Sequence, residues 1–219
     1  MTGTGSAADG RHEFAVTGSE LVYDGAIVAL RVDEVAMPGG GAARREVVEH
    51  HAAVVIAAVD EDDRIVLIRQ YRHPLGARIW ELPAGLMDVA GEPAVEGARR
   101  ELVEEAGLEA SHWSVLADLA ASPGFTDETL RVYLAEGLRR VDRPQAHDEE
   151  ADLEVSAVPL AEAVAMVFAG EIVNAAAVAG ILAVSAARSG AGRPRPVDSP
   201  LPSVTSTAFE SRVRGRDGR

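Results

Sequence analysis

A short acidic helix with clear start and stop signals restricts the fold of this chain more than any other stretch. Pro93 suits the first position of a helix, and Gly107 suits the position just past its end. Four apolar residues between them fall on one stripe at 100° per residue: Val95, Ala98, Leu102 and Ala106. The stripe predicts that the helix packs on a sheet.

Three glutamates lie beside that stripe within one helical turn: Glu101, Glu104 and Glu105. Side chains three and four positions apart are neighbours on a helix. These carboxylates therefore repel one another by about 0.3 kcal/mol per pair. Carboxylate oxygens at this spacing suit a hard cation such as Mg²⁺ or Mn²⁺. A run of like charges is also typical of a solvated helix face. The helix by itself leaves both interpretations open.

Short β-branched runs and turn signals surround the helix and predict strands. The runs 52–59 and 64–71 flank the turn-like "DEDD" and predict a hairpin, and 79–85 and 130–138 predict further strands. Two helices are expected at the end of the folded part: 159–171, and 174–188 capped by Asn174. The fold class is therefore α/β or α+β, with a mixed β-sheet sandwiched between helices.

Composition divides the 219 residues into four parts. A main domain is flanked by a small N-terminal antiparallel β-sheet, recognisable from "PGGG" and short β-branched runs, and by two tails rich in small and polar residues. The predicted parts are a disordered tail at 1–13, the β-sheet region at 14–50, the main domain at 51–189 and a flexible tail at 190–219.

The net charge and the amino-acid composition limit the classes of partner and of site that this chain can have. The formal net charge of −14 disfavours nucleic acid, whose affinity depends on lysine and arginine contacts to phosphate. The chain has no cysteine, so a thiolate metal site or a cysteine nucleophile is excluded. The longest nearly uncharged apolar stretch, 174–187, is too short to span a bilayer, and the N-terminus lacks the apolar core of a signal peptide. We expect a cytoplasmic protein without a membrane partner.

Read outward from the acidic turn, the sequence resembles the Nudix box, G-x5-E-x7-R-E-U-x-E-E-x-G-U, in which U is aliphatic. The matching residues are Gly85, Glu92, Arg100, Glu101, Leu102, Glu104, Glu105, Gly107 and Leu108. Six residues, 86–91, separate the first two where the box has five, so we expect the loop to bulge and the helix register to survive. The resemblance implies a Nudix fold and hydrolysis of a nucleoside diphosphate linked to another group.

A second resemblance concerns the substrate. Pro123 lies sixteen residues beyond Gly107 in "SPGFTDE", as in ADP-ribose pyrophosphatases, and "RQYRHP", "WELPAGLMDVAGEP" and "HDEEAD" also resemble the bacterial, particularly mycobacterial, members. The resemblance covers about residues 14–188. It implies hydrolysis of ADP-ribose to AMP and ribose 5-phosphate with Mg²⁺, Mn²⁺ also being accepted. It further implies a homodimer, with the strands of 14–50 at the subunit interface.

The resemblance also implies roles for single residues. The backbone carbonyl of Ala84 and the carboxylates of Glu101 and Glu105 would bind the metal, and Glu104 would assist directly or through water. A loop glutamate would act as general base. The loop "AHDEEADLEV" offers Glu150, which we favour, then Glu149, with Asp148 and Asp152 as weaker candidates.

Further positions match substrate contacts of the family: Arg45, Arg72, Leu86, Ser122, Pro123 and Glu128. For both Arg45 and Arg72 a structural ion pair is the alternative, and the substrate contact is favoured more for Arg72 than for Arg45. Arg100 is expected to pair with a glutamate of the box, such as Glu92, and to orient the ligands. Gly85, Glu92, Arg100 and Gly107 are thus expected to be structural parts of the motif.

Two other functions are compatible with parts of this pattern. A Nudix hydrolase of another specificity would act on an ADP-sugar or a dinucleotide polyphosphate. A non-catalytic ADP-ribose sensor would have eroded glutamates and an attached DNA-binding domain, whereas here the glutamates are intact and the folded part is poor in basic residues.

Overall fold

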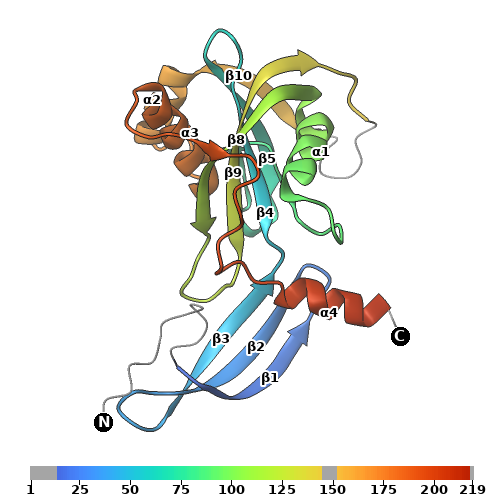
Figure 1. Cartoon of the computed structure of the whole chain (residues 1–219), viewed down its shortest axis with the longest axis vertical. Helices are drawn as coiled ribbons and strands as arrows, with labels where there is room; N and C mark the ends of the chain where they lie inside the picture. Colours follow the sequence, from blue (N-terminus) through green and yellow to red (C-terminus); the bar gives the residue numbers. More distant parts are fainter. Residues whose placement is uncertain (1–13, 145–151, 218–219) are drawn as a thin grey trace. The chain divides into compact units, whose positions relative to one another are not determined.

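The structure is a computed structural model that describes residues 14–144 and 152–217. The chain divides into two compact units (Figure 1), which are described separately. Of the described residues, the first unit comprises 14–52, 122–129 and 201–217, and the second comprises 53–121, 130–144 and 152–200.

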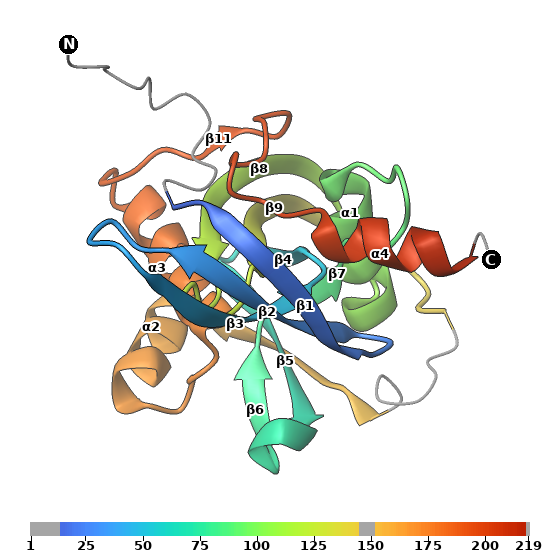
Figure 2. The ribbon, with the colours of Figure 1, turned by 90° about the horizontal axis from the view of Figure 1, so that it is seen from below.

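The first unit is built on an antiparallel sheet in the order β1-β2-β3 (Figure 2). Its strands are β1 (Val16–Asp24), β2 (Val28–Ala36) and β3 (Ala42–His50). Between β2 and β3, Gly40 and Gly41 have φ angles of 86° and 83°, which residues with a side chain rarely adopt. The predicted turn at "PGGG" and the predicted small N-terminal sheet are therefore confirmed.

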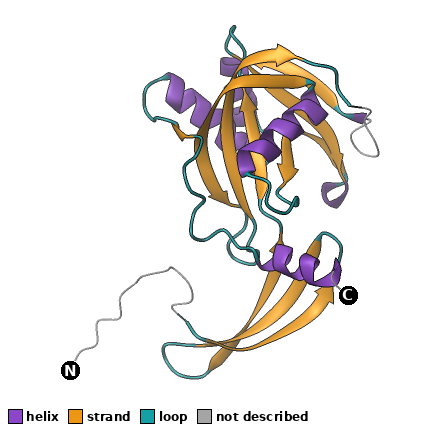
Figure 3. Cartoon of the chain, turned by 45° about the vertical axis from the view of Figure 1, so that its right-hand side comes forward, coloured by secondary structure: helices purple, strands orange, loops and turns teal. Residues whose placement is uncertain are grey.

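The C-terminal residues of the first unit differ from the expected flexible tail, because they form helix α4 (Ala208–Asp217; Figure 3). Phe209 is fully buried, and its ring meets the edge of the His51 ring with centroids 4.8 Å apart. Arg212 donates from Nη2 to Oε2 of the buried Glu49 at 2.6 Å. One aromatic anchor and one buried ion pair thus hold a segment whose Pro, Ser, Gly and Arg content predicts disorder.

In its described residues, the second unit contains two sheets, three α-helices and one 3-10 helix. The larger sheet has the order β11-β8-β9-β4-β7, and its strands are β4 (Ala53–Ala58), β7 (Ala84–Leu86), β8 (Leu108–Ala120), β9 (Thr129–Arg140) and β11 (Arg195–Pro196). The smaller sheet has the order β10-β5-β6, with β5 (Arg64–Arg72), β6 (Ala77–Glu81), β10 (Glu154–Pro159) and the 3-10 helix η1 (His73–Leu75) between β5 and β6. The helices are α1 (Ala94–Ala106), α2 (Leu160–Ala169) and α3 (Ala175–Arg188).

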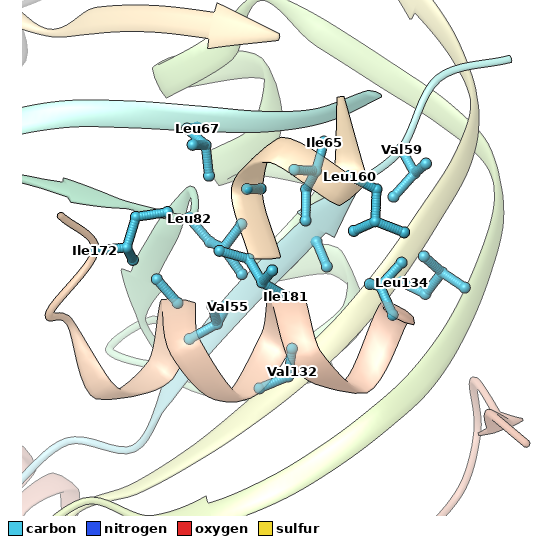
Figure 4. Close-up of a cluster of buried hydrophobic side chains, with 14 residues drawn as sticks. Val55, Val59, Ile65, Leu67, Leu82, Val132, Leu134, Leu160, Ile172 and Ile181 are labelled. Atoms are coloured by element: carbon cyan, nitrogen blue, oxygen red, sulfur yellow. The ribbon is translucent and has the colours of Figure 1, made fainter. Parts of the chain in front are cut away.

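Strand β4 separates two hydrophobic cores, because successive side chains of a strand point to opposite faces. Val54 and Ile56 pack in a cluster with Leu102 of α1. Val55 packs in the other cluster, which includes Ile181 of α3 and residues of α2 (Figure 4). A uniformly apolar strand suits burial on both faces. The predicted arrangement of a mixed sheet between helices is confirmed.

Helix boundaries agree closely with their sequence signals. Helix α1 is flanked by Pro93 and by Gly107, whose φ of 63° lies in the left-handed region. Helix α3 begins after Asn174, whose side chain accepts a hydrogen bond from the N–H of Ala177 at 2.9 Å. The expected apolar stripe of α1 faces the sheet, since Leu102 is fully buried.

Strand pairing differs from expectation in two places. The predicted hairpin is present only at its turn, where Val59 and Ile65 form an isolated antiparallel bridge. Away from the turn, β4 and β5 belong to different sheets. The expected strand at 79–85 is divided into β6 and β7, which also belong to different sheets. In the part of the chain that the structure describes, no helix has the length and apolarity needed to cross a membrane.

Candidate active site

The acidic edge of α1 lies against strand β7. The N–H of Ala84 donates a hydrogen bond to Oε2 of Glu105 at 2.9 Å. A Cβ atom on Gly85 would overlap the carboxylate of Glu101, so the absence of a side chain lets the backbone of β7 approach the helix. The segment 86–91, which contains the extra residue and whose first residue ends β7, precedes α1, and the register of the helix is retained.

Burial separates the three glutamates of the acidic turn. Glu101 and Glu105 are buried, with only 8% and 6% of each residue exposed, whereas Glu104 is partly exposed. A charge that stays ionised when buried requires partners, because transfer of a lone carboxylate from water is costly. The interpretation of this edge as an ordinary solvated face is therefore untenable for Glu101 and Glu105.

Arg100 is the charged centre of this group. Its Nη1 donates to Oε1 of Glu101 at 2.6 Å and to Oε2 of Glu104 at 3.0 Å, and its Nη2 donates to Oε2 of Glu92 at 3.3 Å. Burial alone would lower the pKa of Arg100, but the hydrogen bond to Glu92 and the charges of Glu101 and Glu104 raise that pKa well above its ordinary value. The expected pairing of Arg100 with Glu92 is present, and the same guanidinium also orients two carboxylates of the acidic turn.

The end of α1 is fixed by two contacts. Gly107 ends the helix with its N–H bonded to the carbonyl of Val103 at 3.0 Å. Arg143 donates from Nε to the backbone carbonyl of Glu104 at 2.9 Å. The carbonyl groups of a last helical turn have no partners inside the helix, so this external donor stabilises the turn that carries Glu104 and Glu105.

The donor set fits a hard divalent cation. Two buried carboxylates, Glu101 and Glu105, are packed against the backbone at Ala84 and Gly85, which brings only oxygen ligands of the kind that Mg²⁺ and Mn²⁺ prefer. Among the described residues, three acidic or histidine side chains do not converge on a single point. Glu101 and Glu104 are instead both hydrogen-bonded to Arg100.

Two of the expected substrate contacts belong to the second unit. Arg72, on β5, donates from Nε and Nη2 to the two carboxylate oxygens of Glu81 at 2.9 and 2.6 Å. Leu86, on β7, is partly buried and lies opposite Ala53. The structural ion pair that the sequence left open for Arg72 is therefore present.

The other expected substrate contacts belong to the first unit. The carbonyl of Ser122 accepts hydrogen bonds in the turn that contains Pro123, and Oε1 of Glu128 lies 3.7 Å from Nδ1 of His50. Arg45 is exposed on β3, where Nη1 donates to the carbonyl of Arg44 at 2.9 Å. Ser122, Pro123 and Glu128 belong to one short segment of the sequence, and this segment lies next to β3.

The candidates for general base lie in or next to the loop after β9. Asp148, Glu149 and Glu150 fall outside the described residues. Asp152 is described, and it is exposed and hydrogen-bonded to Arg78. Its observed role is a surface ion pair.

Glu81 is a buried charged residue that was not predicted from the sequence. This residue is 2% exposed and carries a buried carboxylate that binds Arg72 and Gln70. The available signal was a single charged residue inside the apolar run "IWELP". A charge in such a run is costly to bury without a specific partner.

The fold, the register of α1 and its acidic edge are the features that the sequence resemblance to the Nudix box implies. Comparison with known protein families tests that resemblance. The model of the NUDIX domain family matches residues 48–178. The chain belongs to this family.

Relatives within the family make the comparison more specific. The chain is 57% identical over 188 residues to the ADP-ribose pyrophosphatase of Mycobacterium tuberculosis (strain ATCC 25618 / H37Rv), covering 86% of this chain and 91% of that protein. It is 35% identical over 145 residues to the methanol dehydrogenase activator of Bacillus methanolicus, covering 66% of this chain and 78% of that protein. A crystal structure of an ADP compounds hydrolase superposes with a TM-score of 0.71 at 23% identity, covering 82% of this chain and 96% of the other, which shows a shared fold.

Proposed function

We propose that this protein hydrolyses the diphosphate of ADP-ribose to AMP and ribose 5-phosphate in a reaction that requires a divalent metal. The observation that carries the proposal is the intact acidic turn of α1, with Glu101 and Glu105 buried against β7. The choice of ADP-ribose is supported by the 57% identity to an ADP-ribose pyrophosphatase across most of both chains.

The carboxylates of Glu101 and Glu105 and the carbonyl of Ala84 would hold Mg²⁺, or Mn²⁺, and Glu104 would assist. When bound, the ion would neutralise the diphosphate, polarise its P–O bonds and acidify the attacking water. Arg100 orients Glu101 and Glu104, because one nitrogen donates to both. A cation held by these oxygen ligands would make the site locally positive. A protein of net charge −14 could then bind an anionic substrate.

A loop glutamate would take or orient the proton of the attacking water, which typically contributes about 10²- to 10⁴-fold in rate. We assign this role to Glu150, with Glu149 as the neighbouring alternative. Glu150→Gln is expected to depress kcat by a factor of that order, with a much smaller effect on the Mg²⁺ concentration needed for half-maximal rate. A larger loss in Glu149→Gln than in Glu150→Gln would transfer the assignment to Glu149.

Hydrolysis of another ADP-sugar or of a dinucleotide polyphosphate is the second candidate. It is favoured by the similar protein described as an ADP compounds hydrolase, a description that is wider than ADP-ribose alone. A non-catalytic ADP-ribose sensor is disfavoured, because the glutamates of the acidic turn are intact and two of them are buried.

A homodimer through the first unit is part of the proposal. Strand β1 leaves several apolar side chains exposed: Val16, Leu21, Val22 and Tyr23. A three-stranded sheet with apolar residues on its surface gains stability from a partner surface. Light scattering of the purified protein at micromolar concentration is expected to give twice the mass of 23.0 kDa, and a fully active monomer would contradict this.

ADP-ribose is a charged nucleotide that does not cross a bilayer unaided. The proposed reaction therefore belongs in the compartment that holds this nucleotide, and we assign that compartment to the cytoplasm as part of the proposal.

The decisive experiment is incubation of the purified full chain with ADP-ribose and Mg²⁺, followed by identification of the products with and without a chelator. AMP and ribose 5-phosphate in equal amounts, and only with free metal, are the expected result. The same assay with ADP-glucose and diadenosine polyphosphates compares kcat/KM across substrates. Absence of AMP from ADP-ribose, with faster turnover of another substrate, would replace the first candidate by the second.

A further inference from the structure

Glu81 is a buried carboxylate at the end of β6 to which the proposed reaction assigns no role. Both of its oxygens are engaged, since Arg72 donates to Oε1 at 2.9 Å and to Oε2 at 2.6 Å. Gln70, itself buried, donates to Oε2 at 3.1 Å. Figure 2 shows the two strands β5 and β6 that carry these residues running side by side. Three hydrogen bonds thus hold one carboxylate and orient one guanidinium.

Arg72 and Glu81 belong to the sheet face that α1 covers. Val66 of β5 packs in the cluster that contains Leu102 of α1, and Arg72 lies an even number of residues further along the same strand. On β6, Trp80 packs against the other cluster, under α2 and α3, so the side chain of the next residue, Glu81, points to the α1 side.

Glu81 is also close in sequence to the acidic edge of α1. Only two residues separate it from Ala84, whose N–H binds Glu105. Both intervening residues, Leu82 and Pro83, are buried. The short connection from β6 to β7 therefore joins the carboxylate that holds Arg72 to the backbone that contacts the acidic turn.

We propose that Glu81 is a positioning residue, which orients the Arg72 guanidinium to bind the diphosphate of the substrate; this rests on the proposed function. Guanidinium groups bind phosphate oxygens through N–H groups in a fixed plane, so the orientation of that plane decides how well they bind. The Arg72 side chain is 41% exposed, which makes it accessible to a ligand. An arginine fixed in advance loses less side-chain freedom when the ligand binds.

A purely structural role is the alternative, in which the ion pair only neutralises Glu81 and stabilises the β5–β6 hairpin. The two roles differ in one measurable respect. A positioning role acts on the ligand through Arg72, so it disappears when Arg72 is absent. A structural role through the same ion pair lowers the melting temperature and leaves the Kd for ADP of the folded protein unchanged.

The test is a double-mutant cycle with Glu81→Gln, Arg72→Ala and the double variant in the full chain. Dissociation constants for ADP are measured by calorimetry, KM and kcat for ADP-ribose by AMP release, and folding by thermal melting. Glu81→Gln is expected to raise the Kd for ADP and the KM by about tenfold, while kcat falls far less. In the Arg72→Ala background the same change is expected to have no further effect on either constant.

A matched control is available on the same strand. Arg69 of β5 forms an exposed pair with Glu154 at 3.8 Å, so Glu154→Gln removes a carboxylate beside an arginine without touching Arg72. This variant is expected to bind ADP like the wild type. Glu81→Asp provides a second test if the Gln variant does not fold, because it keeps the charge and displaces the carboxylate; its Kd for ADP is also expected to rise.

Equal effects of Glu81→Gln with and without Arg72, or an unchanged Kd for ADP in Glu81→Asp, would overturn the positioning role. The proposed function fails separately, if wild-type protein binds ADP with the expected coupling yet releases no AMP from ADP-ribose. Wild-type protein that does not bind ADP would overturn the positioning role as well.

Discussion

Glu105 combines two interactions that a single substitution can separate. Its Oε2 accepts the N–H of Ala84 at 2.9 Å, and its charge is proposed to bind the metal. In Glu105→Gln the amide oxygen can still accept that hydrogen bond, but the negative charge is lost. We expect kcat/KM for ADP-ribose to fall on the order of 10²-fold or more and the Mg²⁺ requirement to rise, with little change in melting temperature.

The control for this substitution is Glu96→Gln on the same helix. Glu96 is exposed and forms an i,i+3 pair with Arg99 at 3.5 Å, so its loss is expected to leave rate and metal dependence unchanged. Both variants are measured by AMP release across a Mg²⁺ titration. A wild-type rate for Glu105→Gln at saturating Mg²⁺ would show that the acidic turn is not the metal site.

The residues that could be predicted from sequence are those whose role depends on helical periodicity. The register of Glu101, Glu104 and Glu105 follows from the 100° step, and burial of the adjoining stripe places them at the edge of the sheet. Glu81 could not be assigned in this way, because its partner Arg72 comes from a neighbouring strand. Pairing across strands depends on register, which short apolar runs specify poorly.

At the scale of elements, the close approach of β7 to α1 depends on a glycine. A Cβ on Gly85 would overlap the Glu101 carboxylate, so Gly85→Ala is expected to displace that side chain rather than to unfold the sheet. We expect activity and metal affinity to fall at least tenfold, with a stability loss of about 1–3 kcal/mol from the added volume. Gly192→Ala is the control, since a Cβ there meets no atom within 4 Å.

Chelator-competition titration of the metal and urea unfolding of each variant measure the two effects for Gly85→Ala. Unchanged metal affinity together with lower stability would show that Glu101 moves without consequence, and the contact would then be purely structural.

Elements without periodic signals were the hardest to predict. The segment after residue 190 is held by side chains distant in sequence, including Arg131 of β9, which donates to the carbonyls of Ser199 and Pro200 at 2.6 and 2.7 Å. The amino-acid composition of this segment indicates only that it has a low local preference for helix or strand. It does not indicate contacts with residues distant in sequence. Strand β8 was likewise not predicted. Its polar and apolar residues follow neither the period of a helix nor the alternation of a strand clearly.

In the second unit, Asp118 and Arg131 form a buried ion pair. Arg131 is 3% exposed and donates to both carboxylate oxygens of Asp118, at 2.7 and 3.2 Å. Burial alone would raise the pKa of Asp118, but hydrogen bonds from Arg131 and Arg195 outweigh it and lower that pKa below its ordinary value of 3.8. The carboxylate is therefore more acidic in the folded state than in the unfolded state.

A lowered folded-state pKa means that the folded protein resists protonation of Asp118. The stabilisation is then fully present above pH about 4 and is lost as the pH falls through the folded pKa. Asp118→Asn removes the titration and leaves Arg131 buried without its counter-charge, which is expected to cost about 3–5 kcal/mol at neutral pH. The difference in unfolding free energy between wild type and variant is expected to shrink steadily below pH about 4.

Urea unfolding at pH 7, 5 and 3.5 measures this difference directly. Asp62→Asn is a matched control, because Asp62 forms an exposed pair with Arg64 at 2.8 Å and its loss is expected to change stability by less than about 1 kcal/mol at every pH. A gap between wild type and Asp118→Asn that stays constant from pH 7 to 3.5 would mean that Asp118 does not titrate with folding. The tie between β8, β9 and the C-terminal segment would then depend on hydrogen-bond geometry rather than on charge.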